Sequence, residues 1–151
     1  AGDGPLQPDV ERLVGNLGLS ARVDLPGFVS QNDLHGLFEQ AAVFCHPSVT
    51  SASGETEGLP FSILEAQAAG LPVVATHHAG LPEGVADRET GLLVAEGDIG
   101  GLARALQSLL RDTERREAMS RAAVDHAKEH FDLRRQATRL EALYDEILTT
   151  R

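Results

Sequence analysis

Two glutamates, Glu57 and Glu65, lie eight residues apart on either side of a short Gly-Leu-Pro segment. An ionised carboxylate only accepts hydrogen bonds, so two of them can hold two sets of sugar hydroxyl groups. The backbone N–H groups of a helix start lack intrahelical acceptors and attract phosphate. A helix that begins between the two acids would therefore suit a ligand with hydroxyl groups and a pyrophosphate. The spacing alone also fits a capping acid and a surface glutamate on an ordinary helix.

Two further motifs have both a chemical and a structural interpretation. Gly2 and Gly4 begin like a dinucleotide-binding fingerprint, but Gln7 occupies the position of its third glycine, so we do not expect a NAD site. His126 and His130 match an inverted zinc-protease motif and would lie one helical turn apart. A solvated helix face rich in charged residues explains that segment better.

The other reactive side chains are interpreted as structural or surface groups. His77 and His78 follow a predicted strand and could assist phosphate binding, although a histidine pair there is more often loop surface. Cys45 has no neighbouring base in the sequence and is expected in the core. Arg88 could be a cation near the site, but an exposed loop arginine is the expectation. No Gly-x-Ser-x-Gly segment occurs, which argues against a serine hydrolase.

The composition favours one acidic globular domain. The chain has 151 residues, 42% of them hydrophobic and 4% aromatic, with a formal net charge of −10. This charge argues against nucleic acid or an anionic membrane as the main partner, so an anionic ligand would need local donors. No apolar run is long enough to span a bilayer, and no secretory leader is expected. The single cysteine fits a reducing cytoplasm.

Short apolar segments alternate with longer helical patterns, which predicts an α/β fold with a parallel sheet covered on both faces. Four strands are expected, at residues 22–27, 42–46, 72–76 and 91–95. A polar loop at residues 48–58 follows the second strand and precedes a helix. Ligands bind at the carboxyl ends of the strands in such sheets, so this loop is the expected place for a site.

Capping residues and apolar periodicity predict the helices. Helix starts are expected near Pro8, Ser30, Pro60, Asp98 and Asp112. A last amphipathic helix is expected after Phe131, with one apolar face formed by Leu140, Leu143, Ile147 and Leu148.

Several motifs follow one another in a recognisable order: Pro47-Ser48, Glu57-Gly58-Leu59-Pro60, Leu64-Glu65-Ala66, Gly70-Leu71-Pro72, Gly80-Leu81-Pro82-Glu83 and Thr90-Gly91-Leu92-Leu93-Val94. This order resembles the C-terminal domain of family 4 retaining glycosyltransferases, which consist of two facing Rossmann-like domains. The resemblance runs from Gly2 nearly to the C-terminus. It is greatest to members that build bacterial exopolysaccharides.

The resemblance implies a role for each residue around the two glutamates. Glu57 would be the catalytic residue. The donor sugar would be held by Glu57, Gly58, Leu59, Pro60 and Phe61. The nucleotide would be held by Glu65 at the ribose, by N–H groups near Ile63 and Leu64 at the phosphates, and by the backbone of Phe28 and Val29 at the base. Family members need no metal in this site, so no cofactor is expected besides a UDP- or GDP-sugar as substrate.

The resemblance also implies parts that would lie upstream of Ala1. These are an arginine and a lysine that grip the pyrophosphate, the domain's first strand and helix, most of its second strand, and the N-terminal acceptor domain. Residues 1–151 are therefore interpreted as a partial C-terminal nucleotide-sugar-binding domain, truncated at its N-terminal strands and inactive alone. Because the first strand is central in such a sheet, the strands near Val23 and Val43 would lack a shared neighbour. Self-association through unpaired strands is then expected.

The function expected from this resemblance is donor binding within a retaining glycosyltransferase of polysaccharide or glycoconjugate synthesis. Two alternatives stay open: a non-catalytic nucleotide-binding module, and a fragment that completes the sheet of a partner chain. The presence of Glu57 and Glu65 favours donor binding or a nucleotide-binding module over a fragment that completes a sheet. The absence of the pyrophosphate-binding cations favours such a fragment over a fully active enzyme. A cytoplasmic location is expected, with the inner face of the membrane as the alternative for the full-length enzyme.

Overall fold

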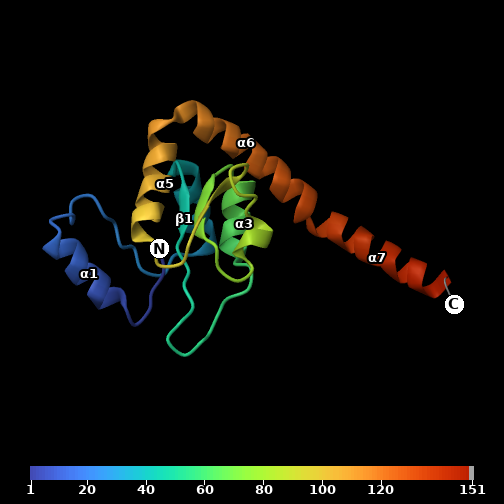
Figure 1. The fold of residues 1–151 in the computed structure, drawn as a ribbon, viewed down its shortest axis with the longest axis horizontal. Helices are drawn as coiled ribbons and strands as arrows, with labels where there is room; N and C mark the ends of the chain where they lie inside the picture. The colour runs from blue at the N-terminus through green and yellow to red at the C-terminus, as the bar shows by residue number, and fades with distance from the viewer. Residues whose placement is uncertain (150–151) are drawn as a thin grey trace. The chain divides into compact units, whose positions relative to one another are not determined.

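The computed structural model describes residues 1–149. The chain divides into two compact units, Ala1–Leu37 and Phe38–Arg151. The first unit contains helix α1 (Gln7–Asn16) and the beginning of α2 (Gln31–Gln40). The second unit contains a β-sheet and the helices that follow it in the chain (Figure 1).

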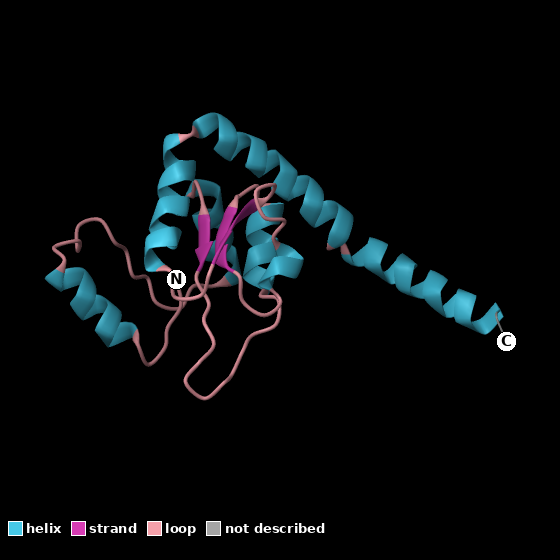
Figure 2. Ribbon diagram, viewed as in Figure 1, coloured by secondary structure: helices cyan, strands magenta, loops and turns pink. Residues whose placement is uncertain are grey.

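The sheet of the second unit consists of three parallel strands within the described residues. These strands are β1 (Phe44–His46), β2 (Val73–Thr76) and β3 (Gly91–Val94), and they lie side by side in the order β1-β2-β3. Helix α3 (Phe61–Ala68) connects β1 to β2, and the single turn α4 (Leu81–Gly84) lies between β2 and β3. The arrangement confirms the predicted α/β class with a parallel, Rossmann-like sheet (Figure 2).

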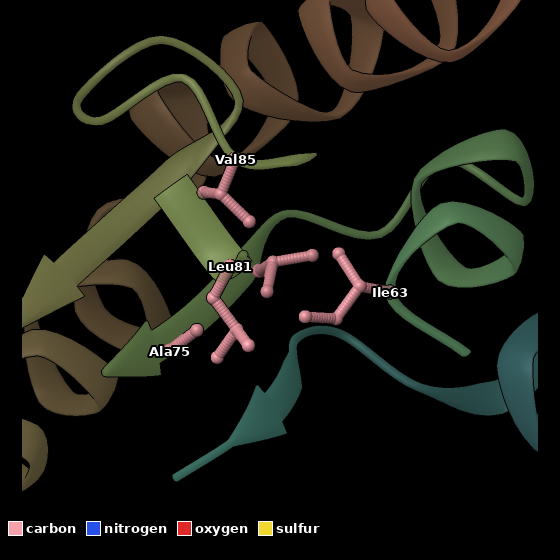
Figure 3. Packing of buried hydrophobic residues seen from close by; sticks show 5 residues of the cluster. Ile63, Ala75, Leu81 and Val85 are labelled. Atoms are coloured by element: carbon pink, nitrogen blue, oxygen red, sulfur yellow. The ribbon is translucent and has the colours of Figure 1, made fainter. Parts of the chain in front are cut away.

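Both faces of the sheet are covered by a hydrophobic core, and the side chains of β2 alternate between the two cores. Val73 and Ala75 pack in one cluster with Ile63 of α3, Leu81 of α4 and Val85. Figure 3 shows Ala75 together with Ile63, Leu81 and Val85. On the opposite face the core is formed by Val74, Ala105, Leu109 and Met119. Complete burial of one such aliphatic side chain stabilises the fold by about 1.5–3 kcal/mol. The continuous apolar sequence of β2 follows from this burial on both sides.

Helices α5 (Ile99–Arg111) and α6 (Thr113–His130) complete the second core. Helix α6 then continues across the unit and packs against α3. Ser120 of α6 donates a hydrogen bond of 2.6 Å to the carbonyl of Gly70, just after α3. Gly70 has φ +84, so it ends α3 in a conformation that glycine adopts without strain. The small side chains of Ala123 and Ala127 are buried and allow α6 to approach α3 closely.

The predicted helix caps are confirmed. Asp98 accepts the N–H of Gly101 at 2.7 Å, and Asp112 accepts the N–H of Arg115 at 2.9 Å. Ser30 accepts the N–H of Asp33 at 3.3 Å, and its hydroxyl donates to the Asp33 carboxylate at 2.6 Å. Such caps each stabilise a helix by about 1 kcal/mol.

The last helix, α7 (Leu133–Thr149), is amphipathic as predicted and has no buried residue. Its apolar side chains are largely exposed at Leu133, Leu140, Leu143, Tyr144, Ile147 and Leu148. None of the described helices combines the length and apolar character needed to cross a membrane.

The prediction of a strand at residues 22–27 is wrong. The segment begins in a turn, in which the N–H groups of Arg22 and Val23 donate to the carbonyl of Leu19 at 2.8 and 3.1 Å. It continues without regular structure, and Leu25 is 39% exposed. The apolar alternation of Val23 and Leu25 is short, and Pro26 removes a backbone donor, so no sheet pairing compensates for ordering the segment. The other three predicted strands are confirmed, each with slightly tighter bounds.

Candidate functional site

The three strands end at one edge of the sheet, and polar residues follow each end. His46 ends β1 and Ser48 lies two residues later; Thr76 ends β2 and His78 lies two residues later. The Thr76 hydroxyl donates to the Ser48 carbonyl at 2.5 Å, which connects the ends of β1 and β2. This edge is where ligands bind in parallel α/β sheets.

Glu57 is held at this edge by two side chains from the end of β1. Its Oε1 atom accepts a hydrogen bond from the Ser48 hydroxyl and lies 3.2 Å from Nε2 of His46. The carboxylate keeps 36% of its side-chain surface exposed, and His46 keeps 25%. Glu57 therefore presents a fixed negative charge and free acceptor capacity to the solvent.

The β1–α3 loop, residues 47–60, is closed on itself at its tip. The N–H of Ser51 donates to the carbonyl of Glu55 at 3.0 Å, and the Ser51 hydroxyl accepts the N–H of Glu55 at 3.0 Å. Gly54 has φ +82 within this turn. The tip is thus an ordered turn, and its exposed side chains lie on the outer end of the loop.

Glu96, which follows β3, connects the same loop to β2. Its Oε2 atom accepts the N–H of Thr50 at 2.9 Å, and its Oε1 atom lies 2.6 Å from Nδ1 of His78. The His78 side chain is only 1% exposed, whereas Glu96 is 35% exposed. The Thr50 N–H, followed by the hydrogen bond with His78, lowers the pKa of Glu96 from its ordinary value.

The returning arm of the loop rests on the turn before α4. A Cβ atom placed on Gly80 would lie 3.0 Å from the backbone of both Gly58 and Leu59. A Cβ atom on Gly84 would collide with the Leu59 side chain. Glycine at position 80 therefore lets the Gly58–Leu59 backbone lie directly on the turn, and glycine at position 84 leaves room for the Leu59 side chain.

Helix α3 begins beside this arm without a side-chain cap. Pro60 is the N-cap residue, and Phe61 is 80% exposed. The N–H groups of Phe61 and Ser62 stand in the first turn, where an α-helix offers no intrahelical acceptor. Ile63 was predicted to offer its N–H to phosphates, but that N–H donates to the Pro60 carbonyl at 3.1 Å, and its side chain is fully buried.

Glu65 lies on α3, apart from the cluster around Glu57. It is half-buried and lines a pocket between α3 and the end of α6. The pocket residues are Phe61, Leu64, Glu65, Ala68, Ala127, Lys128, Phe131 and Asp132. The structure thus brings Glu57 together with His46 and Ser48, and it brings Glu65 together with Phe61 and Leu64.

Phe28 and Val29, predicted at the base, belong to the first unit rather than to the second. Phe28 is 78% exposed, and it follows Gly27, which has φ +69. The carbonyl of Gly27 accepts the N–H of Gly2 at 2.7 Å within the same unit.

The minor candidates of the sequence mostly have structural roles. Arg88 is exposed and pairs with Asp87 at 3.6 Å, as expected of a loop arginine. Burial raises the pKa of the Cys45 thiol, in agreement with a packing role. The rings of His126 and His130 lie 4.6 Å apart, but residues 1–149 offer no group of three metal-ligating side chains.

The sequence analysis did not assign His46, Ser48 or Glu96 to the site, although the structure places all three beside the β1–α3 loop at the carboxyl edge of the sheet. The available signal was their position, because each lies at or just after the end of a predicted strand.

Comparison with known proteins identifies the family. The model of the family described as "Glycosyl transferases group 1" matches residues 1–126. The chain belongs to this family.

Curated glycosyltransferases with related sequences act in polysaccharide synthesis according to their names. The putative colanic acid biosynthesis glycosyltransferase WcaL of Escherichia coli K12 is 35% identical over 132 residues, which are 87% of this chain and 32% of that protein. The amylovoran biosynthesis glycosyltransferase AmsK of Erwinia amylovora is 37% identical over 108 residues, 72% of this chain and 26% of that protein. The chain thus spans about a third of the length of these glycosyltransferases.

Solved glycosyltransferase structures share the fold. Sucrose-phosphate synthase from Thermosynechococcus elongatus matches with a TM-score of 0.81 and 27% identity, over 100% of this chain and 38% of that one. Anabaena HepE in complex with UDP-glucose matches with a TM-score of 0.78 and 26% identity, over 99% of this chain and 40% of that one. The resemblance to glycosyltransferases, and to those of bacterial exopolysaccharide synthesis, is therefore confirmed.

Proposed function

We propose that this chain is the donor-binding part of a retaining glycosyltransferase that uses a UDP- or GDP-sugar. The observation that carries the proposal is the Glu57 carboxylate, held by His46 and Ser48 at the carboxyl edge of the sheet. It lies in the loop that leads directly into the uncapped start of α3. Carboxylate acceptors for sugar hydroxyls and N–H donors for phosphates are thereby available on one short segment.

The relatives support a nucleotide sugar as the ligand and leave its base open. HepE was solved with UDP-glucose, and a relative from Mycolicibacterium smegmatis is named as a GDP-mannose-dependent mannosyltransferase. That relative is 34% identical over 143 residues, which are 94% of this chain and 37% of that protein. These comparisons favour a transferase over the two alternatives left open by the sequence.

The proposed roles divide the donor into three parts. Glu57 and the backbone of Gly58 to Phe61 hold the sugar, and Glu57 is the proposed catalytic residue because its charge stands beside the reacting end of the donor. The N–H groups at the start of α3 hold the phosphates. Glu65 accepts hydrogen bonds from the ribose hydroxyls. No metal is assigned to the site, since the phosphate charge would be met by oriented N–H donors.

Transfer would need an acceptor brought to the open side of this site. The family resemblance assigns acceptor binding to a second, N-terminal domain, and the chain covers about a third of its relatives' length. We therefore propose that residues 1–151 bind the donor but do not catalyse appreciable transfer to a simple acceptor, since nothing would orient the acceptor hydroxyl.

Titration of the chain with UDP-glucose and GDP-mannose tests the donor site. Calorimetry or ligand-observed NMR would compare the unaltered chain with Glu57→Ala and Glu65→Ala. The donor affinity of each variant is expected to fall by a factor of about ten or more, because a lost hydrogen bond to a charged acceptor costs about 1.5–3 kcal/mol. The control is Glu55→Ala, which removes an exposed carboxylate from the tip of the same loop. Equal affinities of Glu65→Ala and Glu55→Ala would refute the ribose assignment.

A further inference from the structure

One carboxylate connects the ends of all three strands. Glu96 follows β3, contacts His78 after β2 at 2.6 Å, and accepts the N–H of Thr50 in the β1–α3 loop at 2.9 Å. The partners lie 18 and 46 residues away in the sequence. A hydrogen bond to an ionised acceptor is about twice as strong as a neutral one, so this contact is a firm attachment point.

His78 fixes the direction of the Glu96 side chain. An exposed glutamate has many rotamers, and ordering them costs entropy. The His78 ring is 1% exposed and therefore held by packing, so its Nδ1 atom offers the carboxylate one defined partner. Glu96 is thereby directed toward Thr50 although 35% of its side chain remains exposed.

The segment after β2 that contains His78 also supports the other arm of the β1–α3 loop. Two residues after His78, Gly80 lies directly against the backbone of Gly58 and Leu59. The outgoing arm is attached through Glu96 to Thr50, and the returning arm rests on Gly80. The tip between these two attached arms is closed by hydrogen bonds between Ser51 and Glu55. The position of the loop depends on these attachments, which act on Glu57 together with its own contacts to Ser48 and His46.

We propose that Glu96 is a positioning residue that, oriented by His78, fixes the β1–α3 loop so that Glu57 stands at the donor sugar. The functional half of this inference rests on the donor site proposed above. The structural half concerns the loop alone and is tested without any ligand.

The experiment combines amide hydrogen exchange with donor titration on the 151-residue chain. Variants at position 96 are Glu96→Asp, Glu96→Gln and Glu96→Ala, and the control is Glu117→Ala, an exposed glutamate of α6. In Glu96→Ala, exchange at Thr50 is expected to accelerate at least about tenfold, because its N–H loses the Glu96 acceptor, while exchange at Val74 in the core stays unchanged. Donor affinity is expected to fall about tenfold. Glu96→Asp and Glu96→Gln retain a hydrogen-bond acceptor. Both variants should therefore show a smaller rise in exchange at Thr50 and a smaller loss of donor affinity than Glu96→Ala.

The outcomes separate this inference from the donor site itself. Unchanged exchange at Thr50 in Glu96→Ala would overturn the attachment, whatever happens to binding. Faster loop exchange with unaltered donor affinity would overturn the positioning role. If the unaltered chain binds neither UDP-glucose nor GDP-mannose, the donor site is wrong, and exchange at Thr50 still decides whether Glu96 holds the loop. A uniform rise in exchange that includes Val74 would identify global destabilisation and would also contradict the proposal.

Discussion

At the residue scale, the site depends on glycines as much as on charged side chains. Gly58 is exposed, whereas Gly80 is partly buried directly beneath it. Gly80 has φ −80, a value open to any residue, so its identity reflects the close approach of another backbone rather than an unusual conformation. The Gly-Leu-Pro sequence occurs at residues 58–60, 70–72 and 80–82. In the last copy, Gly80 makes room for the backbone of Gly58 and Leu59.

Replacing Gly80 is expected to destabilise the second unit. In Gly80→Ala, the new methyl group would lie 3.0 Å from backbone atoms that cannot rotate away. Crowding of this kind costs about 1–3 kcal/mol. Urea denaturation would measure the loss, with Gly100→Ala on α5 as the matched control, since the nearest atom there is the flexible end of Arg104. A Gly80→Ala variant as stable as the Gly100→Ala control would show that the loop does not rest on this turn.

The spacing of Glu57 and Glu65 indicated one segment as the candidate site, but it did not show that the structure places the two acids apart. The sequence shows that one acid precedes a helix and one lies within it. It does not show which way the helix faces, because Ile63 and Ala66 both point into the core and leave Glu65 beside α6. Apart from its position after a predicted strand, nothing in the sequence indicated the contacts of Glu96, since they join residues far apart in the chain.

At the element scale, α6 carries a histidine whose environment disfavours its charged form. Burial, followed by the charge of neighbouring His130, lowers the pKa of His126 from its ordinary value. A hydrogen bond with the Gly84 backbone and the charges of Glu129 and Glu89 act in the opposite direction but are weaker. The Nε2 atom of His126 is buried and has no hydrogen-bond partner in the part of the chain that the structure describes.

Acidification should therefore weaken the packing of α6. The folded state binds a proton at His126 less readily than the unfolded state, so stability is lost as the pH falls below the unfolded pKa of about 6.5 and toward the lower folded value. His126→Gln removes this titration. Melting temperatures of the two proteins measured from pH 8 to pH 5 should show a steeper acid-side decline for the unaltered chain. Parallel curves would mean that His126 titrates alike in both states.

The longer elements were largely predictable, the single turn α4 was not expected, and the failure at residues 22–27 has a local cause. Caps at Ser30, Asp98 and Asp112 are chemical signals that act within three residues, so they could be recognised from the sequence. The three confirmed strands are continuous apolar runs that the sheet buries. The segment at residues 22–27 has only a short alternation interrupted by Pro26, and pairing partners, which decide strand formation, are not encoded locally.

At the scale of the whole molecule, the described sheet has three short strands and two outer edges. Within residues 1–149, β1 pairs with β2 and has its other edge unpaired, whereas the outer edge of β3 is partly covered by Asp87 and Arg88. An unpaired strand edge presents free N–H and C=O groups and can pair with another chain. Self-association was expected from the sequence for this reason, and it remains a prediction. Helix α7 offers a second route, because its apolar face is exposed.

Sedimentation velocity over a series of protein concentrations would test this association and its origin. We expect a concentration-dependent dimer or larger species for the unaltered chain. Leu143→Arg places a charge on the exposed face of α7 without disturbing a buried contact. Association that persists in this variant would come from the strand edges, whereas its disappearance would assign it to α7. A monomer at all concentrations, together with a sharp melt at high temperature, would contradict the prediction.

The closed tip of the β1–α3 loop also has a consequence for how such a protein can change over evolutionary time. Residues 51–55 are exposed and hydrogen-bonded to one another through Ser51, Gly54 and Glu55, while the attachments at Ser48 and Thr50 lie before them. Insertions or deletions in a loop of this kind change the closure entropy only slightly. The outer end of the loop can therefore lengthen, shorten or mutate while the inner end stays in place. New ligand specificity could evolve at Ala52 and Ser53 without changing the contacts of Ser48, Thr50 and Glu57. The same two positions are suitable for inserting a reporter tag.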